Sequence, residues 1–151
     1  MTYSYAYPRP MVTVDIVVLR QGDGGPEILL IQRAHDPFKG CWAIPGGFVD
    51  EHEDLESAAR RELEEETGLR GLAVNQLCAV GTPGRDPRGH TISIVYVAAC
   101  PRTASNAVAG DDAAAARWFS LDDLPELAFD HADILQKVNV HTERDAYDES
   151  E

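Results

Sequence analysis

The stretch GFVDEHEDLESAARRELEEETGL, residues Gly47 to Leu69, carries most of the information about the fold. Its second part predicts an α-helix over residues 55–67, because apolar residues recur there at helical spacing. Asp54 stands directly before this segment, where its side chain can cap the first turn. Gly68 stands where a left-handed helix end is expected. This segment is the best-marked helix in the chain.

The acidic residues of this helix do not keep to its outer face. At about 100° per residue, Glu62 and Glu66 fall within the apolar stripe that should face the core, with Glu65 at its edge. Carboxylates are rarely buried unless they are paired or bind a metal. A break of this kind in the amphipathic pattern indicates a functional site. The apolar stripe itself consists of Leu55, Ala58, Ala59 and Leu63.

The spacing of the three acids favours a divalent metal ion. Glu62, Glu65 and Glu66 stand at i, i+3 and i+4, so their side chains converge within one turn and repel one another unless cations lie among them. Oxygen ligands suit Mg²⁺, with Mn²⁺ as the alternative, and the absence of clustered His or Cys argues against zinc. Taken alone, the helix is also compatible with a solvated acidic surface, because glutamate is a common helix former.

Composition limits the classes of partner. The chain has 151 residues and 44% apolar content, which fits one domain. Its net charge of −13 argues against sequence-independent binding to nucleic acid, which requires Lys and Arg. A small anionic substrate is compatible with this charge if bound cations reverse the local field. We therefore expect metal ions and a small-molecule substrate, and no nucleic-acid partner.

Neither the start of the chain nor its cysteines indicate export. No stretch approaches the roughly 18 apolar residues that a membrane span needs, and the N-terminus lacks a basic region followed by an apolar run. The three cysteines are far apart in the sequence, and we expect reduced thiols. We therefore expect a soluble cytoplasmic protein with no membrane partner.

The remaining sequence predicts strands and helices in mixed order. A hairpin is predicted from residues 12–19 and 27–33, and a short strand over 42–44 leads into Pro45-Gly46-Gly47 and a loop up to Glu53. We expect the two glycines to provide backbone shapes closed to other residues. This order favours an α/β fold with a mixed sheet and a helix on each face, an α/β/α sandwich. We expect one domain over 1–138 and a disordered acidic tail over 139–151. The other predicted elements are strands near 72–80, 90–100 and 115–119 and a helix near 131–138.

The opening segment resembles the signature of the Nudix hydrolase family, G-x5-E-x7-R-E-U-x-E-E-x-G-U, where U is a bulky aliphatic residue. Nine defined positions over 23 residues make a chance match very improbable. The resemblance covers about residues 10 to 138 and implies an α/β/α sandwich built on a mixed sheet. The matching positions are Gly47, Glu53, Arg61, Glu62, Leu63, Glu65, Glu66, Gly68 and Leu69.

The resemblance also implies roles for particular residues. It implies a hydrolase that cleaves the diphosphate linkage of a nucleoside diphosphate derivative with Mg²⁺. The metal ligands are then Glu62, Glu65, Glu66 and a backbone carbonyl near Gly46, with Glu65 and Glu66 closest to the chemistry and Gly47, Glu53 and Arg61 in support. The acid that takes the water proton often comes from a distant loop in this family, so Asp111 and Asp112 are candidates, followed by Asp86.

Segments outside the signature resemble the ADP-ribose pyrophosphatase branch and the related domains that sense ADP-ribose. In that interpretation Arg33, Arg85 and Arg88 contact phosphate or ribose oxygens, because a guanidinium group fits them bidentately. His131 is either a helix cap or a supporting group. The predicted reaction converts ADP-ribose to AMP and ribose 5-phosphate. Hydrolysis of oxidised nucleoside triphosphates and a non-catalytic ADP-ribose sensor are the alternatives. A sensor should carry a DNA-binding segment after this domain, where we expect only the acidic tail. Many relatives pair, so we also expect a homodimer.

Overall fold

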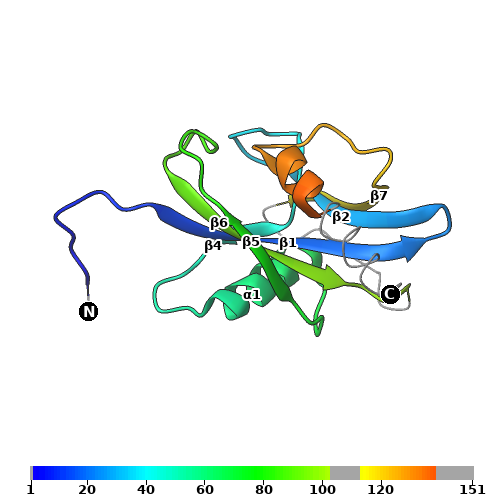
Figure 1. The fold of residues 1–151 in the computed structure, drawn as a ribbon, viewed down its shortest axis with the longest axis horizontal. Coiled ribbons are helices and arrows are strands. Elements are labelled where there is room, and N and C mark those ends of the chain that lie inside the picture. Colours follow the sequence, from blue (N-terminus) through cyan, green and yellow to red (C-terminus); the bar gives the residue numbers. More distant parts are fainter. Residues whose placement is uncertain (1, 103–112, 139–151) are drawn as a thin grey trace, which may run out of the picture.

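The computed structural model describes residues 2–102 and 113–138, and Figure 1 shows their arrangement. A long hairpin of β1 (Met11–Gly22) and β2 (Gly25–Arg33) forms the centre of the sheet. The path through the sheet is β3-β2-β1-β6-β5, while β4 also pairs with β1 and β7 with β2. Since β1 and β6 run parallel and the other pairs antiparallel, the sheet is mixed, as predicted. The other strands are β3 (Trp42–Ala43), β4 (Gly46–Phe48), β5 (Asn75–Val80), β6 (Thr91–Ala99) and β7 (Ala113–Ser120).

Two helices cover opposite faces of this sheet (Figure 1). Helix α1 (Leu55–Thr67) packs on one face, where its Ala59 and Leu63 share a core with Ile16 of β1. Residues 131–138 are helical and pack on the other face, where Ile134 shares a second core with Val17. Neighbouring residues of β1 thus point into different cores, because side chains alternate along a strand. The expected α/β/α sandwich is confirmed.

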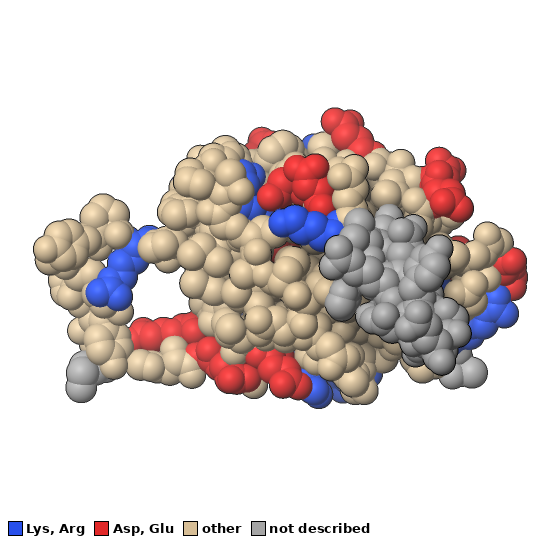
Figure 2. All heavy atoms as spheres, in the orientation of Figure 1, with Lys and Arg blue, Asp and Glu red and all other residues tan. Residues whose placement is uncertain are grey.

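Helix α1 begins and ends at the predicted residues. The side chain of Asp54 accepts hydrogen bonds from the backbone N–H groups of Glu56 and Ser57. Gly68 has φ 77°, and its N–H group donates to the carbonyl of Glu64. Figure 2 shows Asp and Glu side chains gathered along the lower edge of the molecule, where Figure 1 places α1 and the loop before it.

The segment after Pro45 differs from the prediction. The sequence indicates a loop from there to Glu53, but Gly46–Phe48 forms the strand β4 against the first half of β1. The reason proposed for the two glycines is also wrong, because neither Gly46 nor Gly47 has a positive φ. A Cβ atom on Gly46 would lie 2.1 Å from the carbonyl oxygen of Val14, so lack of space excludes a side chain there.

The remaining expectations concern the C-terminal tail, membrane spans and the cysteines. The predicted disordered tail, residues 139–151, lies outside the described residues. In the described part of the chain, no helix is long and apolar enough to cross a membrane. The thiols of Cys41, Cys78 and Cys100 form no disulfide.

Candidate active site

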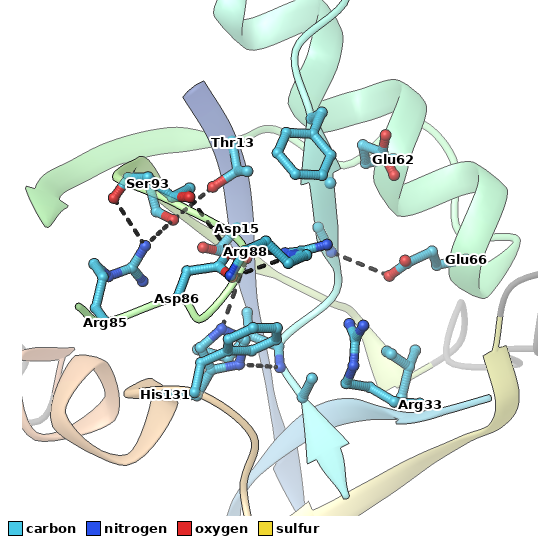
Figure 3. A pocket seen from close by; sticks show the side chains of 18 of the residues that line it. Thr13, Asp15, Arg33, Glu62, Glu66, Arg85, Asp86, Arg88, Ser93 and His131 are labelled. Carbon is cyan, nitrogen blue, oxygen red and sulfur yellow. Dashed lines mark hydrogen bonds and ion pairs between the residues drawn. The ribbon is translucent and has the colours of Figure 1, made fainter. Parts of the chain in front are cut away.

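The site lies where the central strand β1 changes its partner. Thr13 and Asp15, in the first half of β1, pair with Phe48 and Gly46 of β4, whereas Leu19 pairs with β2. A cavity of about 320 Å³ opens there between β1, β4, β6 and α1. Carboxylates of α1 lie on one side of it, and Arg85 and Ser93 lie on the other (Figure 3).

Glu62 and Glu66 reach this cavity from α1, as the helical pattern predicts. The carboxylate of Glu66 accepts a hydrogen bond from the backbone N–H of Gly46 at 3.1 Å. Burial, together with the charges of Glu62 and Asp15, raises the pKa of Glu66 to about 8. Burial also raises the pKa of Glu62. These carboxylates are therefore short of positive charge on the side that faces the cavity.

The glycines let the backbone approach those carboxylates. A Cβ atom on Gly47 would lie 2.5 Å from the carboxylate of Glu62, a contact that no side chain can make. Gly46 brings its N–H group to Glu66. The strand β4 thus packs directly against the carboxylates of Glu62 and Glu66, whose oxygen atoms are ligands of the kind that a divalent cation such as Mg²⁺ prefers.

Arg61 fixes the loop before α1 against the acidic face. Its guanidinium group donates to both carboxylate oxygens of Glu53 at 2.6 and 2.8 Å, and to Glu62 at 2.8 Å. It also donates to the carbonyl oxygen of Phe48 at 3.0 Å. The hydrogen bonds that Arg61 donates hold the pKa of Glu53 at about 2, and the same hydrogen bonds to Glu53 raise the pKa of Arg61. These contacts match the supporting positions predicted for Glu53 and Arg61.

Glu65 does not line the cavity, unlike Glu62 and Glu66. Its side chain is 57% exposed, and it accepts a hydrogen bond from Arg61 at 3.2 Å. Across residues 2–102 and 113–138, no three Asp, Glu, His or Cys side chains are already grouped as a metal site. A bound ion would therefore draw first on Glu62 and Glu66, with Glu65 and the Gly46 carbonyl as the further ligands that the sequence predicts.

Arg85 lies on the opposite side of the cavity, with most of its hydrogen-bond donors already engaged. Its guanidinium group makes two hydrogen bonds to Asp130, at 2.7 and 2.9 Å, and a third to the Ser93 hydroxyl at 2.8 Å. Its side chain is only 5% exposed. Arg85 thus ties β6 and its preceding loop to the start of the second helix, and the predicted contact with substrate would be added to this role.

Arg88 and Arg33 lie at the rim of the cavity among aromatic rings. The Arg88 guanidinium lies 4.9 Å from the ring centre of Phe48 and 5.4 Å from that of Phe129. Arg33 lies 5.0 Å from the same Phe129 ring. Burial lowers the pKa of Arg33, and the charge of Arg88 lowers it further. Two cations close together at a cavity mouth suit a polyanionic ligand such as a diphosphate.

Of the three candidate acids for removing a water proton, only Asp86 lies in the part of the chain that the structure describes. Asp111 and Asp112 lie outside the described residues; the next residue, Ala113, pairs with Arg33 at the cavity. Burial raises the pKa of Asp86, but hydrogen bonds from Arg88 lower it more, and the net shift is downward. A carboxylate held in this way is a weak base, so Asp86 is the poorest of the three candidates.

One residue of the cavity floor, Asp15, was missed in the sequence analysis, and a second, His131, was given two alternative roles there. Asp15 is buried, and its pKa is raised to about 7 by burial. His131 is also buried, and its Nδ1 atom accepts a hydrogen bond from the backbone N–H of Ile44 at 3.0 Å. His131 therefore supports the segment that leads into β4 and does not cap a helix with its side chain. A single acid within the apolar run VTVDIVV was the signal that could have revealed Asp15.

Comparison with known families agrees with this geometry. The model of the NUDIX domain matches residues 9–138, which is most of the chain. The chain belongs to the Nudix hydrolase family. It is 45% identical over 130 residues to an ADP-ribose pyrophosphatase of Methanocaldococcus jannaschii, an alignment that covers 86% of this chain and 73% of that protein.

Two other relatives of this Nudix protein are named for ADP-ribose. An ADPR responsive transcriptional repressor NtrR of Acinetobacter baylyi is 38% identical over 136 residues, which are 87% of this chain and 54% of the repressor. The NUDIX domain of Shewanella oneidensis NrtR, in a cocrystal structure with ADP ribose, superposes with a TM-score of 0.84 at 32% identity. That superposition covers 91% of each chain.

Proposed function

We propose that this Nudix protein hydrolyses ADP-ribose to AMP and ribose 5-phosphate with the help of Mg²⁺, or of Mn²⁺ in its place. The observation that carries the proposal is the pair Glu62 and Glu66, two carboxylates that face one cavity and lack enough positive charge of their own. The 45% identity to an ADP-ribose pyrophosphatase supports the choice of substrate.

The residues divide the reaction between them. When bound, the metal ion would neutralise phosphate oxygens and lower the pKa of a coordinated water. Glu62, Glu65, Glu66 and the Gly46 carbonyl would hold it, while Glu53 and Arg61 keep the carboxylates in place. Water attacks one phosphorus, the bond from that phosphorus to the bridging oxygen breaks, and the water proton passes to a carboxylate. Asp111 or Asp112 is proposed as that carboxylate.

Recognition of the diphosphate falls to the rim of the cavity. Arg88 and Arg33 are proposed to bind phosphate oxygens, since both line the cavity and lie beside one another at Phe129. Arg85 is proposed to reach the substrate only through the network that it stabilises and any donor capacity left by Asp130 and Ser93. Arg88 and Arg33 are thus proposed to contribute more to substrate binding than Arg85. The sequence analysis made no such distinction, because Arg85 and Arg88 look equivalent in the sequence.

A comparison of two substrates tests the proposal. With Mg²⁺ present, kcat/KM for ADP-ribose should exceed that for 8-oxo-dGTP by at least about tenfold, because a site built for a terminal ribose loses hydrogen bonds when the ribose is absent. Chromatography should identify AMP and ribose 5-phosphate. Preferential release of pyrophosphate from the oxidised triphosphate would replace the proposed substrate while leaving the Nudix chemistry in place.

An ADP-ribose sensor is the second candidate function. The named repressor and the ADP-ribose complex of a related NUDIX domain favour it. The two candidates differ in one measurement, since a sensor should bind ADP-ribose with Mg²⁺ and leave it intact. The complete set of signature carboxylates favours hydrolysis.

We further propose that the protein acts in the cytoplasm and forms a homodimer. The free thiols support the first proposal. The resemblance to a family in which many members form dimers supports the second. Light scattering on the purified protein tests the second, and a mass of one chain of 16.5 kDa would exclude it.

A further inference from the structure

The floor of the cavity carries a second group of polar side chains, distinct from the acidic face of α1. Thr13 and Asp15 stand two residues apart on β1, so both point to the same side of the strand. Ser93 on β6 pairs with Thr13, and their hydroxyl groups are hydrogen bonded. All three residues line the cavity, together with His131 (Figure 3). The side chains of Asp15 and His131 are only 9% and 6% exposed.

The hydrogen bonds of His131 set the direction of its free ring nitrogen. Its Nδ1 atom accepts from the Ile44 N–H, so in the neutral ring the proton is on Nε2. Burial holds the pKa of His131 at about 4, so the ring is neutral near pH 7. Nε2 then offers a donor toward Oδ1 of Asp15, an acceptor 4.0 Å away.

This distance is too long for a direct hydrogen bond. A hydroxyl group beside the two atoms, about 2.8 Å from each, can accept from the His131 Nε2–H and donate to the Asp15 carboxyl oxygen at the same time. The hydroxyl of Ser93, held by Arg85 at 2.8 Å, lies on the same floor. The floor thus presents a donor on His131 beside an acceptor on Asp15, a pair that two neighbouring hydroxyl groups of a sugar can satisfy.

Other parts of the proposed substrate fit this floor poorly. A phosphate group would meet the carboxyl group of Asp15 there, which supplies no positive charge and repels a phosphate whenever it is ionised. A purine ring would prefer aromatic side chains, and Phe48 and Phe129 stand at the rim beside Arg88. We propose that Asp15 and His131 bind the hydroxyl groups of the terminal ribose of ADP-ribose, the sugar that leaves as ribose 5-phosphate. This assignment rests on the function proposed above.

Binding of two non-hydrolysable analogues tests the assignment directly. One is α,β-methylene ADP-ribose, and the other is the same compound with a methyl group in place of the terminal ribose. Calorimetry with Mg²⁺ present should show that the wild-type protein binds the ribose analogue at least about tenfold more tightly, since two or more hydrogen bonds distinguish the probes. In Asp15→Asn this preference should fall to about threefold or less. A metal-binding or folding defect would weaken both analogues alike and leave the ratio unchanged.

A second variant and a control complete the experiment. His131→Asn keeps an acceptor near the Ile44 N–H but removes the Nε2 donor, and it should lower the same ratio. Asp133→Asn, an exposed position on the second helix, should keep it. An unchanged ratio in both Asp15→Asn and His131→Asn would overturn the floor assignment, even with ADP-ribose hydrolysed normally. A wild-type protein that neither hydrolyses ADP-ribose nor prefers the ribose analogue would overturn the proposed function as well.

Discussion

The two sides of the cavity treat charge in opposite ways. On the side of α1, Glu62 and Glu66 face the cavity with raised pKa values, because burial and mutual repulsion disfavour their ionised forms. On the far side, Arg85 is paired with Asp130 and Arg88 with Asp86. Arg61 pairs with Glu62 on the first side, but its charge is shared with Glu53, and Glu66 accepts a hydrogen bond from the Gly46 N–H. That side therefore fits a ligand that arrives with positive charge, whereas each arginine of the far side has a carboxylate partner of its own. The first side is therefore built for chemistry and the second for stability and recognition.

The largest expected effect is on the acidic side. With saturating Mg²⁺, Glu66→Gln or Glu62→Gln should lower turnover of ADP-ribose by about a thousandfold, equivalent to about 4 kcal/mol of transition-state stabilisation. Without metal, the melting temperature of Glu66→Gln should not fall, because burial already disfavours the ionised form of Glu66. Steady-state kinetics and thermal unfolding measure the two effects.

The same helix offers a matched control for this prediction. Glu64 is exposed on α1 and pairs with Arg70, itself 77% exposed, so Glu64→Gln should keep turnover within about twofold of wild type. Near wild-type turnover in both Glu62→Gln and Glu66→Gln would show that the metal ligands are wrongly assigned. Removal of metal with a chelator should also abolish hydrolysis by the wild-type protein.

On the far side of the cavity, replacing Arg85 should lower the stability of the fold more than it lowers the rate of hydrolysis. Arg85→Met removes three short hydrogen bonds and leaves Asp130 without its partner, so the free energy of unfolding should fall by about 3 kcal/mol. Urea unfolding measures this change. Arg60→Met, which breaks the exposed pair with Glu56, should cost at most about 1 kcal/mol. Equal stabilities of these two variants would mean that the far side of the cavity contributes nothing to folding.

Through His131, the free energy of unfolding should depend on pH. Burial lowers its folded-state pKa to about 4 from the ordinary 6.5, despite the nearby charge of Asp130. The unfolded chain therefore binds the proton first, and the contribution of His131 to stability is lost as the pH falls from 6.5 to 4. His131→Asn removes this term. The stability difference between wild type and the variant should shrink by about 2 kcal/mol between pH 7 and pH 4.5.

Urea unfolding of both proteins at the two pH values measures this difference. Asp15, whose pKa is raised to about 7, opposes this trend, but it is present in both proteins, so its effect cancels when the two curves are compared. A stability difference that does not change with pH would show that His131 is not held neutral by its surroundings.

The smallest expected effect concerns Arg88, where the far side reaches the rim of the cavity. Arg88→Ala should raise KM for ADP-ribose about tenfold, or about 1.4 kcal/mol, and lower kcat less, which is the pattern of lost ground-state binding. Arg70→Ala is the control, because Arg70 is exposed and remote from the cavity lining. An unchanged KM in Arg88→Ala would return Arg88 to a purely structural pairing with Asp86.

The sequence alone determined helix α1 and the residues that surround it. Helix periodicity, the Asp54 cap and Gly68 are local signals, and local backbone preferences are readable over a few residues. The same periodicity showed that Glu62 and Glu66 share the inner face, and the spacing placed Arg61 beside Glu65. The alternating strands and helices also gave the mixed sheet with a helix on each face.

Only the tertiary structure decided what each residue does on the far side of the cavity. Arg85 and Arg88 look alike in the sequence, but Arg85 pairs with Asp130 across 45 positions, while Arg88 pairs with Asp86 beside it. His131 meets Ile44 across 87 positions, and Gly47 is required by the approach of Glu62. The physical reason is that burial and long-range pairing are set by how the sheet and its two helices pack, whereas periodicity reports only which residues share a face.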